Sequence, residues 1–246
     1  MAAQPTAVIL AAGGGTRLRP LTDNRPKCLL EVGGRTLLDY QLDALAANGV
    51  RDVLIVTGFC AEQVERHAAG RARTLLNPAF EATNNLYSLW VAAAEMSGRD
   101  FLCLHADVLF HPAILAPCLA SPADVCAVLD RALVGETMKA SVAGDQIIEI
   151  GKNLPADRMF GTFFGIARFG PRASAVLPEV LDNLVEKPLN RQAYFTACLP
   201  ELAARGLRVG YCLTEGRPWI EIDSPADLDR AASEVLPKLP FQSAGG

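Results

Sequence analysis

The chain lacks an excess of basic residues. Its 246 residues include 23 lysines and arginines against 27 aspartates and glutamates, which gives a formal net charge of −4. A surface that binds nucleic acid through its charge needs a clustered basic face. Also missing is any apolar run of the roughly 20 residues needed to cross a bilayer. The sequence therefore predicts no nucleic-acid partner and no membrane partner.

Paired cysteine motifs are missing too. The seven cysteines form no Cys-x-x-Cys pair, and most stand in apolar runs, a pattern that favours reduced, buried thiols. The first residues lack the basic stretch and apolar core of a signal peptide, so we expect a cytoplasmic protein. The three histidines, His67, His105 and His111, share no short spacing, and we assign no metal to them.

Short apolar runs alternate with amphipathic segments in the first half of the chain. Strands are expected at residues 6–11, 53–57, 73–76 and 101–105, and helices at 36–48, 61–69 and 85–96. Such alternation predicts a parallel sheet with both faces covered. Ligands of these sheets lie beyond the carboxyl ends of the strands, which places residues 11–27, 77–85 and 106–110 along one edge.

From residue 124 the pattern changes to strands separated by short turns. Strands are expected at 124–130, 138–142, 146–150, 162–169, 208–213 and 219–222, with helices at 172–184, 191–204 and 224–236. Ser224 is the expected N-cap of the last helix, with Pro225 at its first position.

A glycine-rich loop follows the first strand. Gly13, Gly14 and Gly15 can point several backbone N–H groups into one concavity that suits phosphate oxygens, and Arg17 and Lys27 add fixed positive charge. The alternative is a surface turn with two solvated cations. The loop lacks the Gly-Lys-Ser/Thr of a P-loop, and leucine at position 18 breaks a Gly-x-Gly-x-x-Gly pattern. We predict a polyphosphate site.

Residues 10–27 resemble the N-terminal motif of the nucleotidyltransferases that activate sugar phosphates and choline phosphate. The resemblance covers residues 6–236 and implies an α/β fold with a Rossmann-like, mixed and mostly parallel sheet flanked by helices, like that of nucleotide-diphospho-sugar transferases. It also implies that a phosphorylated acceptor attacks the α-phosphorus of a nucleoside triphosphate and releases pyrophosphate. In this motif Arg17 would hold the triphosphate and Lys27 would neutralise charge at the α-phosphate.

On this basis we expect one domain over residues 1–246. Residues 6–122 would form its nucleotide-binding half and residues 123–236 a smaller, β-rich acceptor-binding half. Residues 237–246 would form a loose tail.

A divalent metal is expected on physical grounds, because transfer between phosphate anions depends on positioning and charge neutralisation. Mg²⁺ usually binds one or two carboxylates. Asp107 and Asp223 each follow a predicted strand, and both match the positions of the family's two metal-binding aspartates. The alternatives are a solvated strand-end carboxylate and a helix-start carboxylate. Glu221 is a weaker third candidate, since strand alternation gives it the face of Asp223.

Residues 77–90 resemble cytidylyltransferases that act on phosphocholine and on small phosphonates such as 2-aminoethylphosphonate. The Gln-Pro-x-Gly-Leu-Ala stretch of thymidylyl- and uridylyltransferases is absent. Tyr87 and Trp90 offer aromatic surface, or pack in the core. The predicted nucleotide-binding residues are Leu10, Ala11, Ala12, Gly13, Gly14, Gly15, Thr16, Arg17, Lys27, Thr83, Asn84, Ser88 and Ala106.

A second lysine should meet the acceptor's phosphate. Lys187 stands in a Val-Glu-Lys-Pro stretch like that of sugar nucleotidyltransferases, but it joins two predicted helices. In the family the lysine follows a β-hairpin and precedes a strand, as Lys152 does here. We therefore predict Lys152, together with Lys27 and Arg17, as the catalytic set, and Lys187 as a solvated loop residue.

The residues that would bind the non-phosphate end of the acceptor are the least well defined by the sequence. An amine would call for a carboxylate or an aromatic cage, which Glu136, Tyr194 and Glu221 could supply. Thr162 stands where the phosphocholine-type pattern often has an acidic residue, so a hydroxylated phosphonate or a polyol phosphate stays open.

The sequence as a whole predicts a CTP-dependent cytidylyltransferase that uses Mg²⁺ and a small phosphonate or phospho-alcohol acceptor. No Ser/His or Cys/His constellation suggests a covalent intermediate. One alternative is a sugar- or cyclitol-1-phosphate nucleotidyltransferase. Another is a nucleotide-binding regulatory protein without catalysis. Assembly into a homo-oligomer stays open.

Overall fold

The computed structural model describes residues 5–135 and 137–241. Its main sheet has nine strands in the order β5-β4-β1-β6-β11-β8-β12-β10-β9. These are β1 (Thr6–Ala11), β4 (Asp52–Thr57), β5 (Arg73–Leu76), β6 (Phe101–His105), β8 (Val125–Asp130), β9 (Met138–Ala143), β10 (Gln146–Gly151), β11 (Gly161–Phe169) and β12 (Val209–Leu213).

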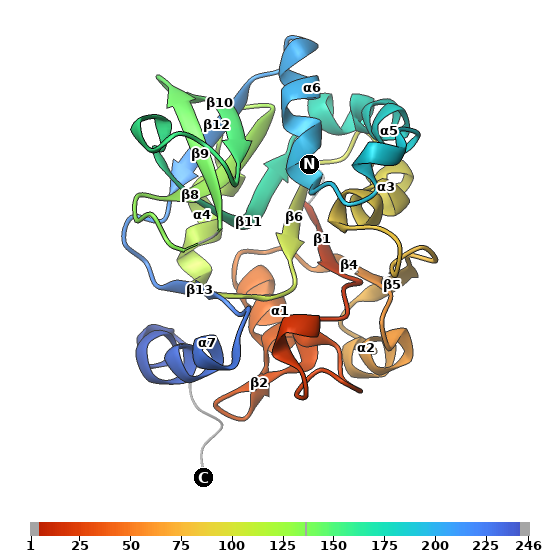
Figure 1. Ribbon diagram of the computed structural model, residues 1–246, viewed down its shortest axis with the longest axis vertical. Coiled ribbons are helices and arrows are strands. Elements are labelled where there is room, and N and C mark those ends of the chain that lie inside the picture. Colours follow the sequence, from red (N-terminus) through yellow and green to blue (C-terminus); the bar gives the residue numbers. More distant parts are fainter. Residues whose placement is uncertain (1–4, 136, 242–246) are drawn as a thin grey trace.

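The sheet is mixed. β5, β4, β1 and β6 run parallel to one another, and β8 runs parallel to β12. β11 lies antiparallel between β6 and β8, and β10 antiparallel between β12 and β9. β9 also pairs with the first residues of β11, so the acceptor half predicted from the sequence folds its outer strands back onto the centre of the sheet (Figure 1).

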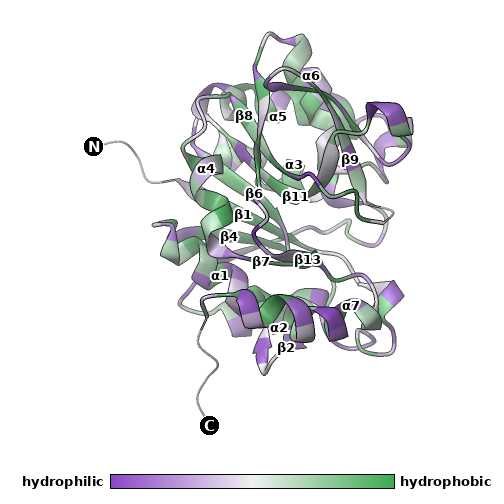
Figure 2. Ribbon diagram, turned by 90° about the vertical axis from the view of Figure 1, so that its left-hand side faces the viewer, coloured by the Kyte–Doolittle hydropathy of each residue, from purple (hydrophilic) through white to green (hydrophobic). Residues whose placement is uncertain are grey.

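Helices cover both faces of the sheet. α1 (Leu37–Ala47), α2 (Ala61–Ala68) and α4 (Leu115–Leu119) pack on one face, and α3 (Asn85–Met96), α5 (Pro171–Val185) and α6 (Cys198–Ala204) on the other. Alternation along β1 divides its side chains between the two cores: Val8 and Leu10 face α3, whereas Ala7 and Ile9 face α1. Figure 2 shows the strands coloured as hydrophobic between more polar helices.

A third, smaller hydrophobic core lies outside the main sheet, next to the edge where the parallel strands end. It joins the hairpin of β2 (Glu31–Val32) and β3 (Arg35–Thr36) to the pair of β7 (Val108–Phe110) and β13 (Trp219–Glu221), and to α7 (Pro225–Arg230). This core anchors the C-terminal segment against the loop after β6. It thereby brings together residues from the two ends of the chain.

The predicted α/β class with a mixed sheet and flanking helices is confirmed, and β1, β5, α3 and β6 have the predicted bounds. Three details differ. The predicted helix 191–204 begins only at Cys198, the predicted helix 224–236 is α-helical only to Arg230 and then continues as a π-turn, and the β2–β3 and β7–β13 pairs were not predicted. Among the described residues, no helix has both the length and the apolar character that a membrane span requires.

Candidate active site

A cleft of about 970 Å³ opens along the carboxyl ends of β1, β5, β6 and β8. One wall comes from the loop after β1 and the start of α3. The other comes from the segment after β8, from β13 and from the N-terminus of α7. The cleft thus lies where parallel α/β sheets place their ligands, between the two predicted halves.

Local contacts with residues further along the same segment fix the conformation of the glycine-rich loop. Gly15 has φ of +58°, a left-handed conformation that glycine adopts without steric cost. The Thr22 hydroxyl donates to the Gly15 carbonyl at 2.8 Å, and a Cβ on Gly15 would stand 3.3 Å from the Cβ of Lys27. The loop therefore turns tightly enough for Lys27 to enter the cleft.

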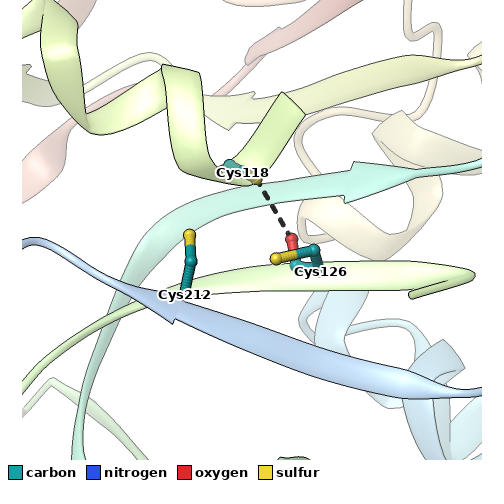
Figure 3. A group of neighbouring side chains, drawn as sticks. All are labelled: Cys118, Cys126 and Cys212. Atoms are coloured by element: carbon teal, nitrogen blue, oxygen red, sulfur yellow. Dashed lines mark hydrogen bonds between the residues drawn. The ribbon is translucent and has the colours of Figure 1, made fainter. Parts of the chain in front are cut away.

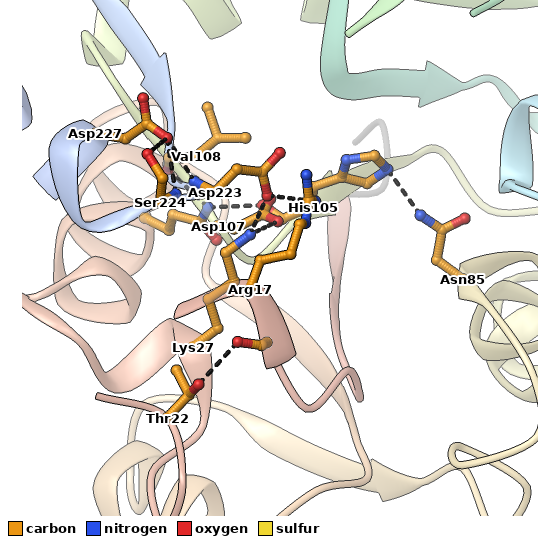
Figure 4. Close-up of polar contacts among 12 residues, drawn as sticks. Arg17, Thr22, Lys27, Asn85, His105, Asp107, Val108, Asp223, Ser224 and Asp227 are labelled. Atoms are coloured by element: carbon orange, nitrogen blue, oxygen red, sulfur yellow. Dashed lines mark hydrogen bonds and ion pairs between the residues drawn. The ribbon is translucent and has the colours of Figure 1, made fainter. Parts of the chain in front are cut away.

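Four charged side chains meet at the floor of the cleft (Figure 4). Lys27 Nζ donates to Asp107 Oδ2 and to Asp223 Oδ1, each at 2.7 Å, and Arg17 donates to the same Asp223 oxygen at 2.7 Å. The Lys27 side chain is 14% exposed, whereas Arg17 is 70% exposed. Lys27 is a fixed internal cation, and Arg17 reaches over the opening of the cleft.

In this cluster, burial and the charges of neighbouring residues shift the pKa values in opposite directions. Burial alone would lower the pKa of Lys27, but Asp107 and Asp223 outweigh it and raise the pKa above its ordinary value. Burial would raise the pKa of Asp107, but the charge and the hydrogen bond of Lys27 keep it lowered. The lysine therefore carries its proton and Asp107 is ionised at neutral pH.

Each aspartate is placed by backbone structure. The Asp107 carbonyl accepts from the N–H of Ile222 at 2.9 Å, which ties the β6–β7 turn to the end of β13. Asp223 precedes Ser224, the N-cap of α7, and the Asp227 carboxylate accepts from the backbone N–H groups of both residues at 3.1 and 2.8 Å. This is a capping arrangement, and it fixes the direction of Asp223.

The donor set fits a divalent cation. Asp107 Oδ1 is buried and has no hydrogen-bond donor among the described residues, which is unusual for a carboxylate oxygen unless it serves a ligand. Glu221 offers a third carboxylate close to Asp107 and His105, with ligand atoms within 4.8 Å of one another. Burial, followed by the charges of Asp107 and Asp223, raises the pKa of Glu221 to about 8. The carboxyl oxygens gathered at this point are the hard ligands that Mg²⁺ prefers.

His105 forms the rear of the cluster. Its Nε2 lies 3.1 Å from the Asn85 amide nitrogen, and the Asn85 oxygen accepts from the Phe195 N–H at 2.7 Å. Burial lowers the pKa of His105, so the ring is neutral and Nε2 accepts from Asn85. Spacing in the sequence had assigned no metal to His105, but in the structure its ring lies close to Asp107 and Glu221, with ligand atoms within 4.8 Å of one another.

The predicted nucleotide residues line the cleft, with one exception. Gly14 does not reach it and instead lies against Phe59. Asn77, which was not predicted individually, donates to Ser88 Oγ at 3.1 Å and lies 3.5 Å from Thr83 Oγ1, so the three polar side chains form one group at the start of α3. Tyr87 and Trp90 do not line the cleft.

Only some of the residues predicted to bind the acceptor lie together in the cleft. Lys152 lies with Nζ 4.9 Å from the centre of the Tyr194 ring, and both line the cleft with Glu221. Lys187 does not. Glu136 lies outside the described residues.

Thr162, which we had placed among the acceptor-binding candidates because the phosphocholine-type pattern often has an acidic residue there, is fully buried and does not line the cleft. β11 pairs at this position with both β8 and β9, so neighbouring strands flank Thr162 on both sides. Its hydroxyl donates to the Ala132 carbonyl at 2.7 Å and accepts from the Val134 N–H at 3.0 Å. Thr162 therefore holds the loop after β8 instead of facing an acceptor.

Three side chains important to this wall were missed. Asp130 accepts from Trp219 Nε1 at 2.8 Å and from Thr214 Oγ1 at 2.6 Å, and Trp219 stacks on Phe164. Lys139 is buried and donates to the carbonyls of Val134, Gly135 and Thr137. The position of Asp130 at a strand's carboxyl end was a usable signal. Nothing in the sequence marked Lys139.

Comparisons with known proteins point to nucleotidyl transfer. The choline-phosphate cytidylyltransferase of Streptococcus pneumoniae is 40% identical over 93 residues, which cover 37% of this chain and 40% of that protein. A solved structure of CTP:phosphocholine cytidylyltransferase from the same species has a TM-score of 0.74 at 25% identity and covers 94% of this chain and 98% of that one.

Two further relatives align over most of the chain. The CTP:phosphoglutamine cytidylyltransferase of Campylobacter jejuni is 25% identical, over 91% of this chain and 97% of that protein. The CMP-5'-(3-aminopropyl)phosphonate synthase of Streptomyces rubellomurinus is 30% identical over 94% of this chain. The chain spans only 39% of that synthase and 40% of the choline-phosphate enzyme.

A family model, described as the MobA-like NTP transferase domain, matches residues 7–165. The matched region contains the glycine-rich loop, Lys27 and Asp107, and thus most of the charged floor of the cleft. The chain belongs to the family of MobA-like NTP transferase domains.

Proposed function

We propose that this chain is a cytidylyltransferase that transfers CMP from CTP to a small phosphonate or phospho-alcohol and releases pyrophosphate. The observation that carries the proposal is the position of Lys27 between Asp107 and Asp223, directly below the glycine-rich loop. A buried ammonium beside two carboxylates, at the mouth of an anion-binding loop, suits a reaction whose charge develops on phosphate oxygens.

The triphosphate would lie along the backbone N–H groups of residues 13–16, with Arg17 over its outer phosphates. An oxygen of the acceptor's phosphate or phosphonate attacks the α-phosphorus. The bond from that phosphorus to the β-phosphate's bridging oxygen breaks, and pyrophosphate leaves. Lys27 neutralises the charge that grows on the α-phosphate oxygens. Alignment of the two substrates supplies much of the remaining rate enhancement.

Asp107 and Asp223 would hold Mg²⁺, with Glu221 beside them. When bound, the ion supplies further charge neutralisation at the phosphates. The buried Oδ1 of Asp107, which has no hydrogen-bond partner in the described part of the chain, supports this assignment.

Cytosine is proposed as the base. Asn77, Thr83 and Ser88 form a compact group of polar side chains at the start of α3, where they can read a base edge. The four relatives and structures described above are named as CTP-using or CMP-linked enzymes, which supports cytosine over uracil or thymine.

The acceptor would enter beside Lys152, whose ammonium can pair with its phosphate while Tyr194 covers the side chain. Trp219, Asp130 and Glu221 line the opposite wall and suit a small polar group. The cleft thus offers a cation for one end of the acceptor and carboxylates for the other.

The test is pyrophosphate release by the purified protein with each of four nucleoside triphosphates and Mg²⁺. The acceptors are phosphocholine, 2-aminoethylphosphonate, a hydroxyalkylphosphonate, inositol 1-phosphate and glucose 1-phosphate. We expect release with CTP and one of the first three, a CDP- or CMP-linked product by mass, and loss of activity with EDTA. Release with only a cyclitol or sugar phosphate would overturn the acceptor class. Nucleotide binding without release from any acceptor would instead favour a regulatory protein.

A further inference from the structure

Three cysteines meet on the face of the sheet that α4 covers, outside the cleft. Cys118 comes from α4, Cys126 from β8 and Cys212 from β12 (Figure 3). Their sulfur atoms all lie within 4.8 Å of one another. Cys118 and Cys126 are fully buried and Cys212 is partly exposed. None of the three lines the proposed active site.

The strand register argues against a disulfide between the two strand cysteines. β8 and β12 are parallel neighbours in which Cys126 stands opposite Gly210 and Cys212 opposite Val128. The two cysteines are thus two residues out of register, which separates their α-carbons by about 8 Å for ordinary strand spacing and rise. A disulfide needs α-carbons closer than about 7 Å. The side chains converge, but the backbones are too far apart to be bonded.

A metal ion has no such difficulty. Three sulfurs that each lie about 2.3 Å from a central ion are separated by about 4 Å from one another, and the observed spread of up to 4.8 Å is close to this. The three ligands come from three separate elements, so small side-chain rotations suffice to close the ring. The geometry is that of a three-coordinate sulfur site.

The three sulfur ligands favour a soft metal ion that accepts three-fold coordination. Among the residues that the structure describes, the cluster contains sulfur ligands only, with no histidine or carboxylate as a fourth. Thiolates favour Cu(I) or zinc, but zinc sites are almost always four-coordinate.

We propose that Cys118, Cys126 and Cys212 form a binding site for a monovalent soft metal ion, Cu⁺, held by three sulfurs. Each thiol that binds the ion releases its proton to the solvent, and the oxidation state of the metal does not change. The ion would tie α4 to β8 and β12 and so stabilise this side of the sheet.

The test is titration of the reduced protein with Cu⁺, kept reduced by ascorbate, in competition with bicinchoninate. We expect one Cu⁺ per chain and a rise in the melting temperature. Cys212→Ser should weaken binding at least tenfold. Cys60→Ser is the matched control, because Cys60 is also partly exposed but lies outside the cluster, and it should bind like the unmodified protein. Equal affinity for Cys212→Ser, or equal loss for Cys60→Ser, would overturn the site.

Two further measurements keep the proposal testable if Cys212→Ser is unstable. Copper X-ray absorption of the unmodified complex should show three sulfur neighbours, and a shell that contains nitrogen or oxygen would refute the assignment. Competition with Zn²⁺ should leave Cu⁺ bound. Displacement by an equal amount of Zn²⁺ would mean that the site prefers a tetrahedral ion.

Discussion

The α-carbon of Gly165 lies against the imidazole ring of His105. A Cβ built at position 165 would stand 2.3 Å from the ring, and the residue has φ of +91°. β11 passes close to the end of β6, and the absence of a side chain at position 165 leaves room for the His105 ring, which lines the cleft.

Gly165→Ala should therefore reduce both stability and turnover. The backbone conformation is strained for alanine, and either the ring or the strand must move, at a cost above about 1 kcal/mol. Urea unfolding and pyrophosphate release would measure the two effects. Gly144→Ala is the control, since its Cβ would meet no atom within 4 Å and its φ is also positive, at +60°. Equal losses for the two variants would show that backbone strain alone is responsible.

Lys27→Ala should lower kcat by about 10²–10³, the usual effect of removing one charge-stabilising group from a transition state. Binding of CTP should weaken much less. Arg25→Ala, which removes an exposed cation near Glu31 on the same segment, should leave kcat within twofold. Near-normal turnover of the Lys27 variant would contradict the proposed role.

Lys152→Ala should reduce kcat/KM for the acceptor at least tenfold, which corresponds to about 1.4 kcal/mol. Lys187→Ala should have no such effect, because Lys187 does not line the cleft. Steady-state kinetics with a varied acceptor would distinguish the two lysines. The reverse order of effects would refute Lys152 as the acceptor's cation.

Lys139→Met should raise the KM for the acceptor while CTP affinity stays unchanged. The variant leaves the carbonyls of Val134, Gly135 and Thr137 without their shared charged donor, and a hydrogen bond to a charged group contributes about 1.5–3 kcal/mol. The loop after β8 should loosen as a result. Lys139 acts through that loop, so a fall in kcat without a change in KM would argue against this positioning role.

Asp39 should make the fold sensitive to acid. Burial alone would raise its pKa, but hydrogen bonds from Thr36 and the charge of His67 bring the pKa below its ordinary value of 3.8. A lowered folded-state pKa gives stability that is present above the ordinary value and is lost as the pH falls through the folded value. The stability difference between the unmodified protein and Asp39→Asn should therefore be larger at about pH 7 than at about pH 3. Urea unfolding at both pH values measures it, and a difference independent of pH would contradict this account.

Local sequence patterns were sufficient for much of the fold. α3 has a clear apolar face, and β1 and β6 are continuous apolar runs, so all three have the predicted bounds. The rule that ligands lie at the carboxyl ends of parallel strands placed Asp107 beside the loop. The position of Asp223 came from a family resemblance, and the structure brings it within 2.7 Å of Lys27.

Features that depend on contacts between residues far apart in the chain were the ones that the sequence did not predict. Thr162 is buried because β11 pairs with β8 on one side and β9 on the other, and no local pattern records a strand with two partners. In the sequence, Lys139 has no feature that separates it from an ordinary strand lysine. Only in the folded protein does it contact the loop after β8. The start of α6 was missed because residues Phe195–Ala197 form a 3₁₀ turn before it, and the two share the same apolar spacing.

Asp223 stands 206 positions after Arg17 in the chain. During synthesis on the ribosome, Lys27 and Asp107 therefore emerge long before the second carboxylate. A nascent chain that has reached residue 165 contains the whole matched family region but not β12, β13 or α7. At that stage Lys27 can pair with only one of its two aspartates, and the part of the cleft wall that β13 and α7 form is missing. The proposed nucleotidyl transfer therefore requires the segment that carries Asp223 to dock onto the strands that precede it in the chain.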